Sequence, residues 1–263
     1  MKYCKVVLLV GTLIILFSGC GDSEVKVLEE NYLDTKLGKI ENKKLIVNVT
    51  EPDLAKKILS KKPKSVSEKK QRFKDILVPI TTLVFKQLDE QYKRVKKDIE
   101  NNKNREYIEL LKEEYNAQTD ETLLHALKPH PISIALAQAA AESAWLTSRF
   151  TKEAYNIFGV WSFNKDEPRI AASGLRGSKT IYLKKYKTLK AAVEDYYKNI
   201  GRNWAYAEFR KQRTITNDPY KLSEYLGSYS EKKEVYIELL KSMIKYNKFH
   251  EHDVIKDSIN WKY

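Results

Sequence analysis

Cysteine and histidine are scarce in this sequence. Its 263 residues include two cysteines, Cys4 and Cys20, and 4 histidines. An exported protein that has lost its first 19 residues would keep Cys20 alone, so it could form no internal disulfide and its stability would depend on packing. We expect neither a metal nor a cofactor, because no metal-ligand spacing connects the histidines, which are His125, His130, His250 and His252.

Long hydrophobic runs are also absent. The apolar stretch over residues 6–17 is 12 residues long, whereas a helix that crosses a bilayer needs about 20. Two lysines precede it, and Ser18 and Gly19 lead to Cys20, which is the pattern of a secretory signal peptide. The segment LFSGC resembles the lipobox of bacterial lipoproteins, in which the cysteine is lipidated and becomes the first mature residue. We expect a signal peptide at 1–19, a lipid anchor at Cys20 and a polar tether over 20–44. An ordinary cleaved signal is the alternative.

Acidic residues are fewer than basic ones. The chain has 48 Lys and Arg against 35 Asp and Glu, a formal net charge of +13. Such a charge favours polyanionic partners, which include acidic cell-wall polymer, anionic lipid and nucleic acid. We expect no nucleic acid, because export leaves none in the compartment and the lysines are spread over the predicted helices.

Most of the chain after residue 44 predicts helices. Residues 45–49 are a strand or an extended lead-in, and residues 51–59 read as a helix begun by Pro52. Residues 65–115 are strongly helical, with Pro79 expected to kink or interrupt the first part. Apolar residues recur there at the spacing of a buried helix stripe, at Phe73, Ile76, Leu77, Ile80, Leu83, Val84 and Leu88. Another helix starts near Thr119–Glu121, and two prolines at 129 and 131 mark its boundary with the next.

A helix predicted over residues 131–150 holds one glutamate among alanines. Steps of 100° place Gln138, Glu142, Trp145 and Arg149 on one stripe beside a face of small residues. That face allows close helix packing, so the polar stripe would face a groove. Desolvation beside an indole would raise the pKa of Glu142, as a general acid requires. On spacing alone, a glutamate that is solvated or paired with Arg149 is the simpler explanation.

Residues 137–163 resemble the signature of glycoside hydrolase family 73. The resemblance is carried by Gln138–Ala140, Glu142–Ser143, Ala144–Trp145 and Asn156–Gly159, and it continues to YLGSYSEKKEVYIELLKSMI, so it covers about residues 120–250. The preceding residues resemble the helical prelude of the Bax subgroup. The resemblance implies a mainly α, lysozyme-like α+β fold. It places a glucosaminidase domain with a small β-lobe at 119–263, after a helical N-terminal region at 45–118.

The family consists of N-acetylglucosaminidases that cut peptidoglycan between GlcNAc and MurNAc. The resemblance therefore implies that Glu142 is the general acid and that Tyr229 is the active-site tyrosine, whereas Tyr236 is assigned to packing. For Trp161, two roles remain open, which are contact with a sugar ring and structural packing. The full set of substrate-binding candidates is Gln138, Trp145, Asn156, Phe158, Gly159 and Trp161.

The sequence departs from the family pattern in the β-lobe. Residues 180–182 read Thr-Ile-Tyr, with no acid where family members often carry a second carboxylate. If one acid suffices, the 2-acetamido oxygen of the substrate attacks the anomeric carbon, oriented by Tyr229. We favour this interpretation over a loop carboxylate that substitutes. The acids available nearby are Asp166, Glu167, Glu194 and Asp195.

Two rival functions remain open. A lytic transglycosylase also needs a single helix glutamate, and a protein with a decayed site would only bind glycan. The expected partners are peptidoglycan glycan strands and, through the lipid anchor, a membrane. We expect a monomer in the bacterial cell envelope, at the periplasmic face of the outer membrane. The helical region at 45–118 could gate the groove, bind a partner or complete the core.

Overall fold

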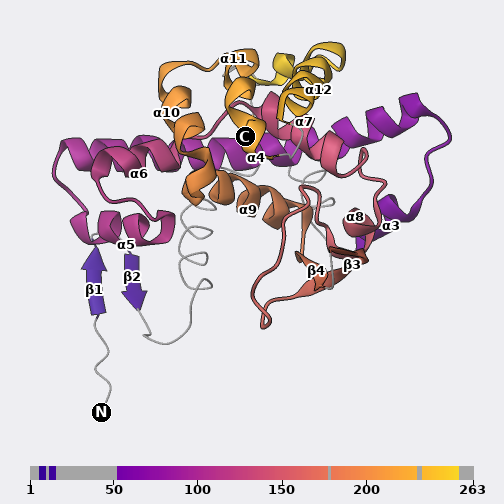
Figure 1. Cartoon of the computed structure of the whole chain (residues 1–263). Coiled ribbons are helices and arrows are strands. Elements are labelled where there is room, and N and C mark those ends of the chain that lie inside the picture. The colour runs from indigo at the N-terminus through magenta and orange to yellow at the C-terminus, as the bar shows by residue number, and fades with distance from the viewer. Residues whose placement is uncertain (1–5, 10–11, 16–51, 177–178, 230–232, 255–263) are drawn as a thin grey trace, which may run out of the picture. The chain divides into compact units, whose positions relative to one another are not determined.

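The structure is a computed structural model that describes residues 6–9, 12–15, 52–176, 179–229 and 233–254. The chain divides into two compact units. The first, residues 1–44 with 257–263, contains strand β1 (Val6–Leu9) paired antiparallel with β2 (Thr12–Ile15), both inside the predicted signal-peptide core. Cys20, the predicted tether and residues 45–49 lie outside the described residues. The second unit, residues 45–256, contains every other element (Figure 1).

Two helices open the second unit. The predicted helix near Pro52 is confirmed as α3 (Pro52–Ser60), and α4 (Val66–Glu100) follows it. The Ser65 side chain caps α4 by accepting a hydrogen bond of 3.0 Å from the Glu68 amide. Of the kink or interruption predicted at Pro79, the interruption is wrong, since α4 runs through this residue. Proline removes one amide from the hydrogen-bond ladder, whereas the buried apolar stripe holds the helix against the core on both sides of it. Members of that stripe that are buried are Phe73, Ile76, Leu77, Ile80 and Val84.

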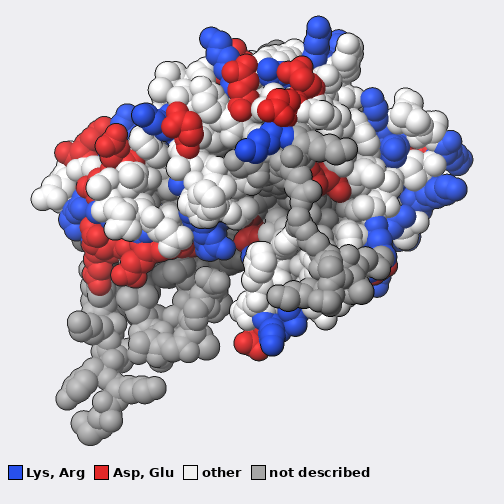
Figure 2. Space-filling view, viewed as in Figure 1, with Lys and Arg blue, Asp and Glu red and all other residues white. Residues whose placement is uncertain are grey.

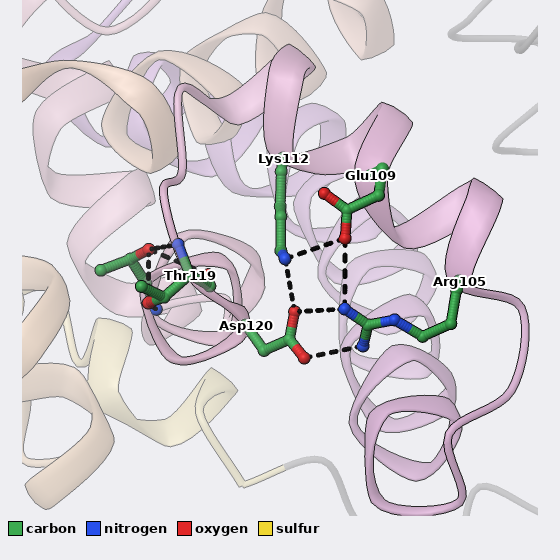
Figure 3. A network of polar contacts seen from close by, with 6 residues as sticks. Arg105, Glu109, Lys112, Thr119 and Asp120 are labelled. Carbon is green, nitrogen blue, oxygen red and sulfur yellow. Dashed lines mark hydrogen bonds and ion pairs between the residues drawn. The ribbon is translucent and has the colours of Figure 1, made fainter.

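Helix α5 (Arg105–Tyr115) is fastened to α6 (Asp120–Leu127) by a polar network, shown in Figure 3. Asp120 accepts hydrogen bonds of 2.7 and 3.1 Å from the Arg105 guanidinium and lies 2.7 Å from Lys112 Nζ. These two cations lower the pKa of Asp120 to about 2. Thr119 caps α6, so the helix start predicted there is confirmed.

The remaining elements complete the unit in chain order. The β-lobe is a hairpin whose register pairs Arg169 with Lys184 and which carries a bulge between Ala171 and Leu175. The fold is thus mainly α with a small β-lobe, as predicted. The elements are α7 (Ile132–Glu142), α8 (Arg149–Ala154), β3 (Arg169–Arg176), β4 (Lys179–Lys184), α9 (Leu189–Arg202), η1 (Trp204–Tyr206), α10 (Ala207–Ile215), α11 (Pro219–Ser223), η2 (Glu224–Tyr229), α12 (Lys233–Tyr246) and η3 (Phe249–His252).

One hydrophobic core joins α4 to the helices that follow. It contains Phe73 from α4, Leu136 from α7, Val193 from α9 and Leu240 from α12. The predicted boundary between residues 118 and 119 therefore falls inside a single compact unit. Of the three roles left open for the N-terminal helices, completing the core is the one that their packing carries out.

Charge is unevenly distributed over the surface. On the face shown in Figure 2, acidic side chains gather at the end that carries α5 and α6, and basic ones gather over α3 and the first half of α4. Between these ends both signs are interspersed, so the excess of lysine and arginine does not form one continuous surface on this face. Within the described part of the chain, none of the helices is both long enough and apolar enough to cross a membrane.

Candidate active site

Helix α7 ends at Glu142, so the prediction of one helix over 131–150 is wrong. The Ser143 side chain donates to the Ala139 carbonyl and accepts a hydrogen bond of 2.8 Å from the Leu146 amide. Ala144, Trp145 and Leu146 then take left-handed φ values of 50°, 64° and 63°. Such side-chain bonds compete with helix continuation. Glu142 is consequently the last residue of α7, and Arg149 begins a separate helix.

The position of Glu142 favours its protonated form. The C-terminal end of a helix carries partial negative charge, which disfavours a carboxylate there. Burial by neighbouring groups raises the pKa of Glu142, and the hydrogen bond from Tyr236 only partly opposes this. The side chain nonetheless remains exposed on one side. Glu142 is therefore an acid whose pKa is raised and whose side chain can still meet a substrate.

A chain of buried hydrogen bonds leads to the acid. The Tyr236 hydroxyl donates to Glu142 Oε1 over 3.1 Å, and Gln138 Nε2 donates to Tyr236 over 3.1 Å. The Tyr196 hydroxyl donates to Gln138 Oε1 and lies 2.9 Å from His130 Nε2. Because the Tyr196 proton is committed to Gln138, His130 donates to Tyr196. Each hydrogen bond in this series is then donated in the direction of Glu142.

This series of hydrogen bonds changes the roles predicted for Gln138 and Tyr236. Gln138 was expected to bind substrate, but its side chain is completely buried, so the prediction is wrong. It instead directs the Tyr236 hydroxyl toward the acid. Tyr236, which the sequence assigned to packing, is both buried and bonded to Glu142. The contact joins residues 94 positions apart, so no local pattern could have revealed it.

A hollow of about 310 Å³ opens beside Glu142, within the size range of ligand pockets. Asp195, Asn199 and Arg202 form one side of it, and their spacing of four and three residues puts them on one face of α9. An aromatic wall faces this polar stripe. The aromatic wall consists of Phe158, Trp161 and Phe163, and the other lining residues are Gly159, Val160, Lys184, Asn203 and Tyr206.

Two lining residues connect the hollow to the acid. A methyl group placed on Gly159 would lie 3.6 Å from Glu142 Oε2, and Gly159 has a φ of +66°, a left-handed conformation that glycine adopts readily. Burial, together with the charge of Glu142, raises the pKa of Tyr206 to about 12. The acid thus lies beside the hollow, next to its lining residue Gly159.

The predicted aromatic contacts have different outcomes. Trp161 lines the hollow with 41% of its surface exposed, as a sugar contact requires. Phe158 also lines the hollow but is nearly fully buried, stacked on Tyr196 with ring centroids 3.9 Å apart. Trp145 packs away from the hollow, 5.1 Å from the Phe73 ring and 5.0 Å from Lys70 Nζ. Trp145 therefore does not line this hollow, because the left-handed turn after Glu142 carries its ring toward α4.

Asn156 is a structural residue, so its predicted contact with substrate is wrong. It is buried, and its amide donates to the Val160 and Lys184 carbonyls at 2.9 Å each. Its Oδ1 accepts from the Val160 amide over 3.0 Å. These bonds hold the Phe-Gly turn against β4 and so keep Gly159 beside the acid.

Among the described acids, Asp195 is the one that lines the hollow. It accepts hydrogen bonds from Tyr186 (2.7 Å) and Lys184 (3.2 Å). Glu167 accepts from Ser162 Oγ over 2.7 Å, and Asp166 lies in an exposed turn. The other predicted catalytic residue, Tyr229, ends η2, but its side chain is outside the described part. No group of three or more metal-ligating side chains occurs among the described residues.

Several residues in or next to the hollow were missed from the sequence. Phe163 and Trp204 are 84% and 86% exposed, and Trp204 directly follows the lining residue Asn203. The spacing of Asp195, Asn199 and Arg202 on one helix was visible in the sequence. It carried no functional signal until the β-lobe was known to face it.

Comparisons with known proteins find similar domains. Residues 121–249 match the family described as mannosyl-glycoprotein endo-beta-N-acetylglucosaminidase. A search of curated proteins finds no match. Similar solved structures include the catalytic domain of the autolysin Auto from Listeria monocytogenes, with 19% identity, 76% of this chain and 94% of that chain covered, and a TM-score of 0.48. An N-acetylmuramoyl-L-alanine amidase from Staphylococcus aureus has 17% identity, 67% and 44% coverage and a TM-score of 0.40. A glycoside hydrolase domain of FlgJ from Salmonella typhimurium has 22% identity, 52% and 97% coverage and a TM-score of 0.36.

Proposed function

We propose that this protein, a glycoside hydrolase whose residues 121–249 form a glucosaminidase domain, hydrolyses the β-1,4 bond between GlcNAc and MurNAc in peptidoglycan. The observation that carries the proposal is Glu142, a partly exposed acid with a raised pKa beside a hollow. The aromatic wall of the hollow offers a surface for the apolar face of a pyranose. The polar stripe of α9 offers hydrogen bonds to its hydroxyl and acetamido groups.

In the proposed mechanism Glu142 acts twice. It first donates its proton to the glycosidic oxygen while the bond from that oxygen to C1 of GlcNAc breaks. The acetamido oxygen of the same GlcNAc attacks C1 and forms a cyclic oxazolinium, and Tyr229 holds the acetamido group for this attack. Water then attacks C1 and gives its proton to the Glu142 carboxylate, which restores the acetamide and the acid.

Product analysis tests this function against its rivals. Purified sacculi are digested with the protein, and the released fragments are analysed by mass spectrometry. Reducing GlcNAc ends support the hydrolase, whereas 1,6-anhydro-MurNAc ends would identify a lytic transglycosylase. Binding to sacculi with no released fragment would identify a glycan-binding protein without activity.

Replacing Tyr236 with phenylalanine should move the pH profile. The hydroxyl stabilises the charged form of Glu142, so its loss raises the pKa of the acid further, and the alkaline limb of kcat/KM shifts to higher pH. We also expect kcat/KM on the acidic side to fall by up to about tenfold, the value of one hydrogen bond. The measurement is a pH series on sacculi.

The control for this variant is Tyr246→Phe. Tyr246 lies on the same helix and is 78% exposed, so its hydroxyl does not reach the acid. Its profile should coincide with that of the wild type. An alkaline limb that stays in place or moves to lower pH in Tyr236→Phe would contradict the proposed role of the hydroxyl.

We also propose that Cys20 is lipidated and holds the domain in the bacterial envelope, at the periplasmic face of the outer membrane. The support is the LFSGC segment that follows a short apolar run. Acyl chains contribute about 0.8 kcal/mol of membrane binding per buried CH₂, so Cys20→Ala should move most of the protein from the membrane fraction to the soluble fraction. Cys4→Ala is the control, because it changes a residue that cleavage removes. Retention of Cys20→Ala in the membrane would refute the anchor.

A further inference from the structure

Arg202 is a half-buried cation on the polar side of the hollow. Among the described residues, no carboxylate lies within ion-pair distance of it. The other cation of the hollow, Lys184, differs, because its Nζ lies 3.2 Å from Asp195 and 3.9 Å from Glu167. Asp195 is further occupied by the Tyr186 hydroxyl. The hollow thus holds one neutralised cation and one whose charge faces the space that a ligand would fill.

Arg202 is not needed to cap its own helix. It is the last residue of α9, where unpaired carbonyl oxygens attract a cation. Arg210 already serves these carbonyls, because its Nη1 donates to the Ile200 carbonyl over 3.1 Å and to the Asn203 carbonyl over 2.6 Å. The structural duty of a basic residue at this helix end is therefore met by a different side chain.

We propose that Arg202 binds a carboxylate carried by the glycan in the hollow and so selects acidic glycans over neutral ones. The inference rests on the proposed function and names the feature of the substrate that the site recognises. A guanidinium pairs with a carboxylate through two parallel hydrogen bonds, and partial burial beside an aromatic wall strengthens such a pair. In peptidoglycan the carboxylate is that of the MurNAc lactyl group where no peptide is attached, or that of the peptide stem where one is.

Binding measurements in a Glu142→Gln background test this without turnover. Three glycans are titrated by calorimetry: strands stripped of peptide, the same strands with their lactyl carboxylates methyl-esterified, and strands with intact, uncrosslinked stems. Adding Arg202→Gln should weaken binding to at least one carboxylate-bearing glycan by about tenfold or more, since a charge-assisted hydrogen bond is lost. Binding of the ester should not change. Loss of affinity for stripped strands identifies the lactyl carboxylate as the group that Arg202 binds. Loss of affinity only for stem-bearing strands identifies a carboxylate of the peptide.

Lys190→Gln is the matched control. It removes the same charge from α9, but Lys190 pairs with Glu194 and does not line the hollow. Arg202→Lys should recover part of the affinity. The inference is overturned if Arg202→Gln weakens the ester and the free acid equally, or if none of the three glycans binds. Failure of the proposed function has a different signature, namely no fragments from sacculi treated with the wild type while the dependence of binding on Arg202 persists.

Discussion

Glu142→Gln should lower kcat/KM on purified sacculi by about 10³-fold, within the range that general acid catalysis contributes. The amide keeps the shape of the side chain and can still accept the hydrogen bond from Tyr236, but it has no acidic proton to give to the leaving oxygen. The melting temperature should stay close to that of the wild type, because the side chain is exposed on one side. Release of reducing ends and a thermal melt on the same sample separate loss of chemistry from loss of fold.

The wild-type pH profile supplies a second readout of the same residue. Because burial raises the pKa of Glu142, the protonated acid persists to higher pH than an ordinary glutamate would allow. kcat/KM should therefore fall as pH rises through that pKa, and the residual rate of Glu142→Gln should lack this alkaline limb. A rate near that of the wild type in Glu142→Gln would remove Glu142 from the role of acid.

A double variant tests whether one acid suffices. Asp166→Asn with Glu167→Gln should retain activity, since neither residue lines the hollow. Asp195→Asn is the companion variant, because Asp195 does line it. Loss of activity in the double variant with the fold intact would contradict the one-acid mechanism. The same loss in Asp195→Asn would make Asp195 the second carboxylate.

Phe73→Ala should destabilise the protein by about 3–5 kcal/mol, the usual cost of deleting a fully buried phenylalanine ring. The ring is completely buried, with its centroid 5.1 Å from that of Trp145 and 6.0 Å from that of Phe249. Since domains are commonly stable by about 5–15 kcal/mol, the loss should be evident as a lower midpoint in urea denaturation. Val66→Ala is the control on the same helix. Val66 is 65% exposed, so its truncation should change stability by less than about 0.5 kcal/mol.

The same packing predicts that residues 119–263 alone do not fold. Removing α4 would expose the face of α7 that it covers and would free Trp145, whose ring packs against Phe73 and Phe249. Trp145 belongs to the turn that ends α7 at Glu142, so α4 also helps to position the acid. A fragment 119–263 with cooperative unfolding and full activity would show that the N-terminal helices are dispensable.

Local patterns in the sequence determined much of this protein. The apolar spacing around Phe73 predicted a buried helix face, Thr119 predicted a helix start, and the prolines at 129 and 131 predicted the boundary before α7. These features depend on residues within a few positions of one another, so their physical causes are present in a short segment of chain.

The arrangement around the acid was decided only by the tertiary structure. Helical periodicity indicates which side chains share a face, but it does not say which distant segment that face meets. Tyr236 contacts Glu142 from 94 residues away in the sequence. Gln138 is buried because its amide hydrogen-bonds to the hydroxyls of Tyr196 and Tyr236. Propensity favoured a longer α7, yet Ser143 and the packing of Trp145 ended it at Glu142. Long-range contacts of this kind place the acid at a helix end beside the hollow, because burial and hydrogen bonding there outweigh local preference.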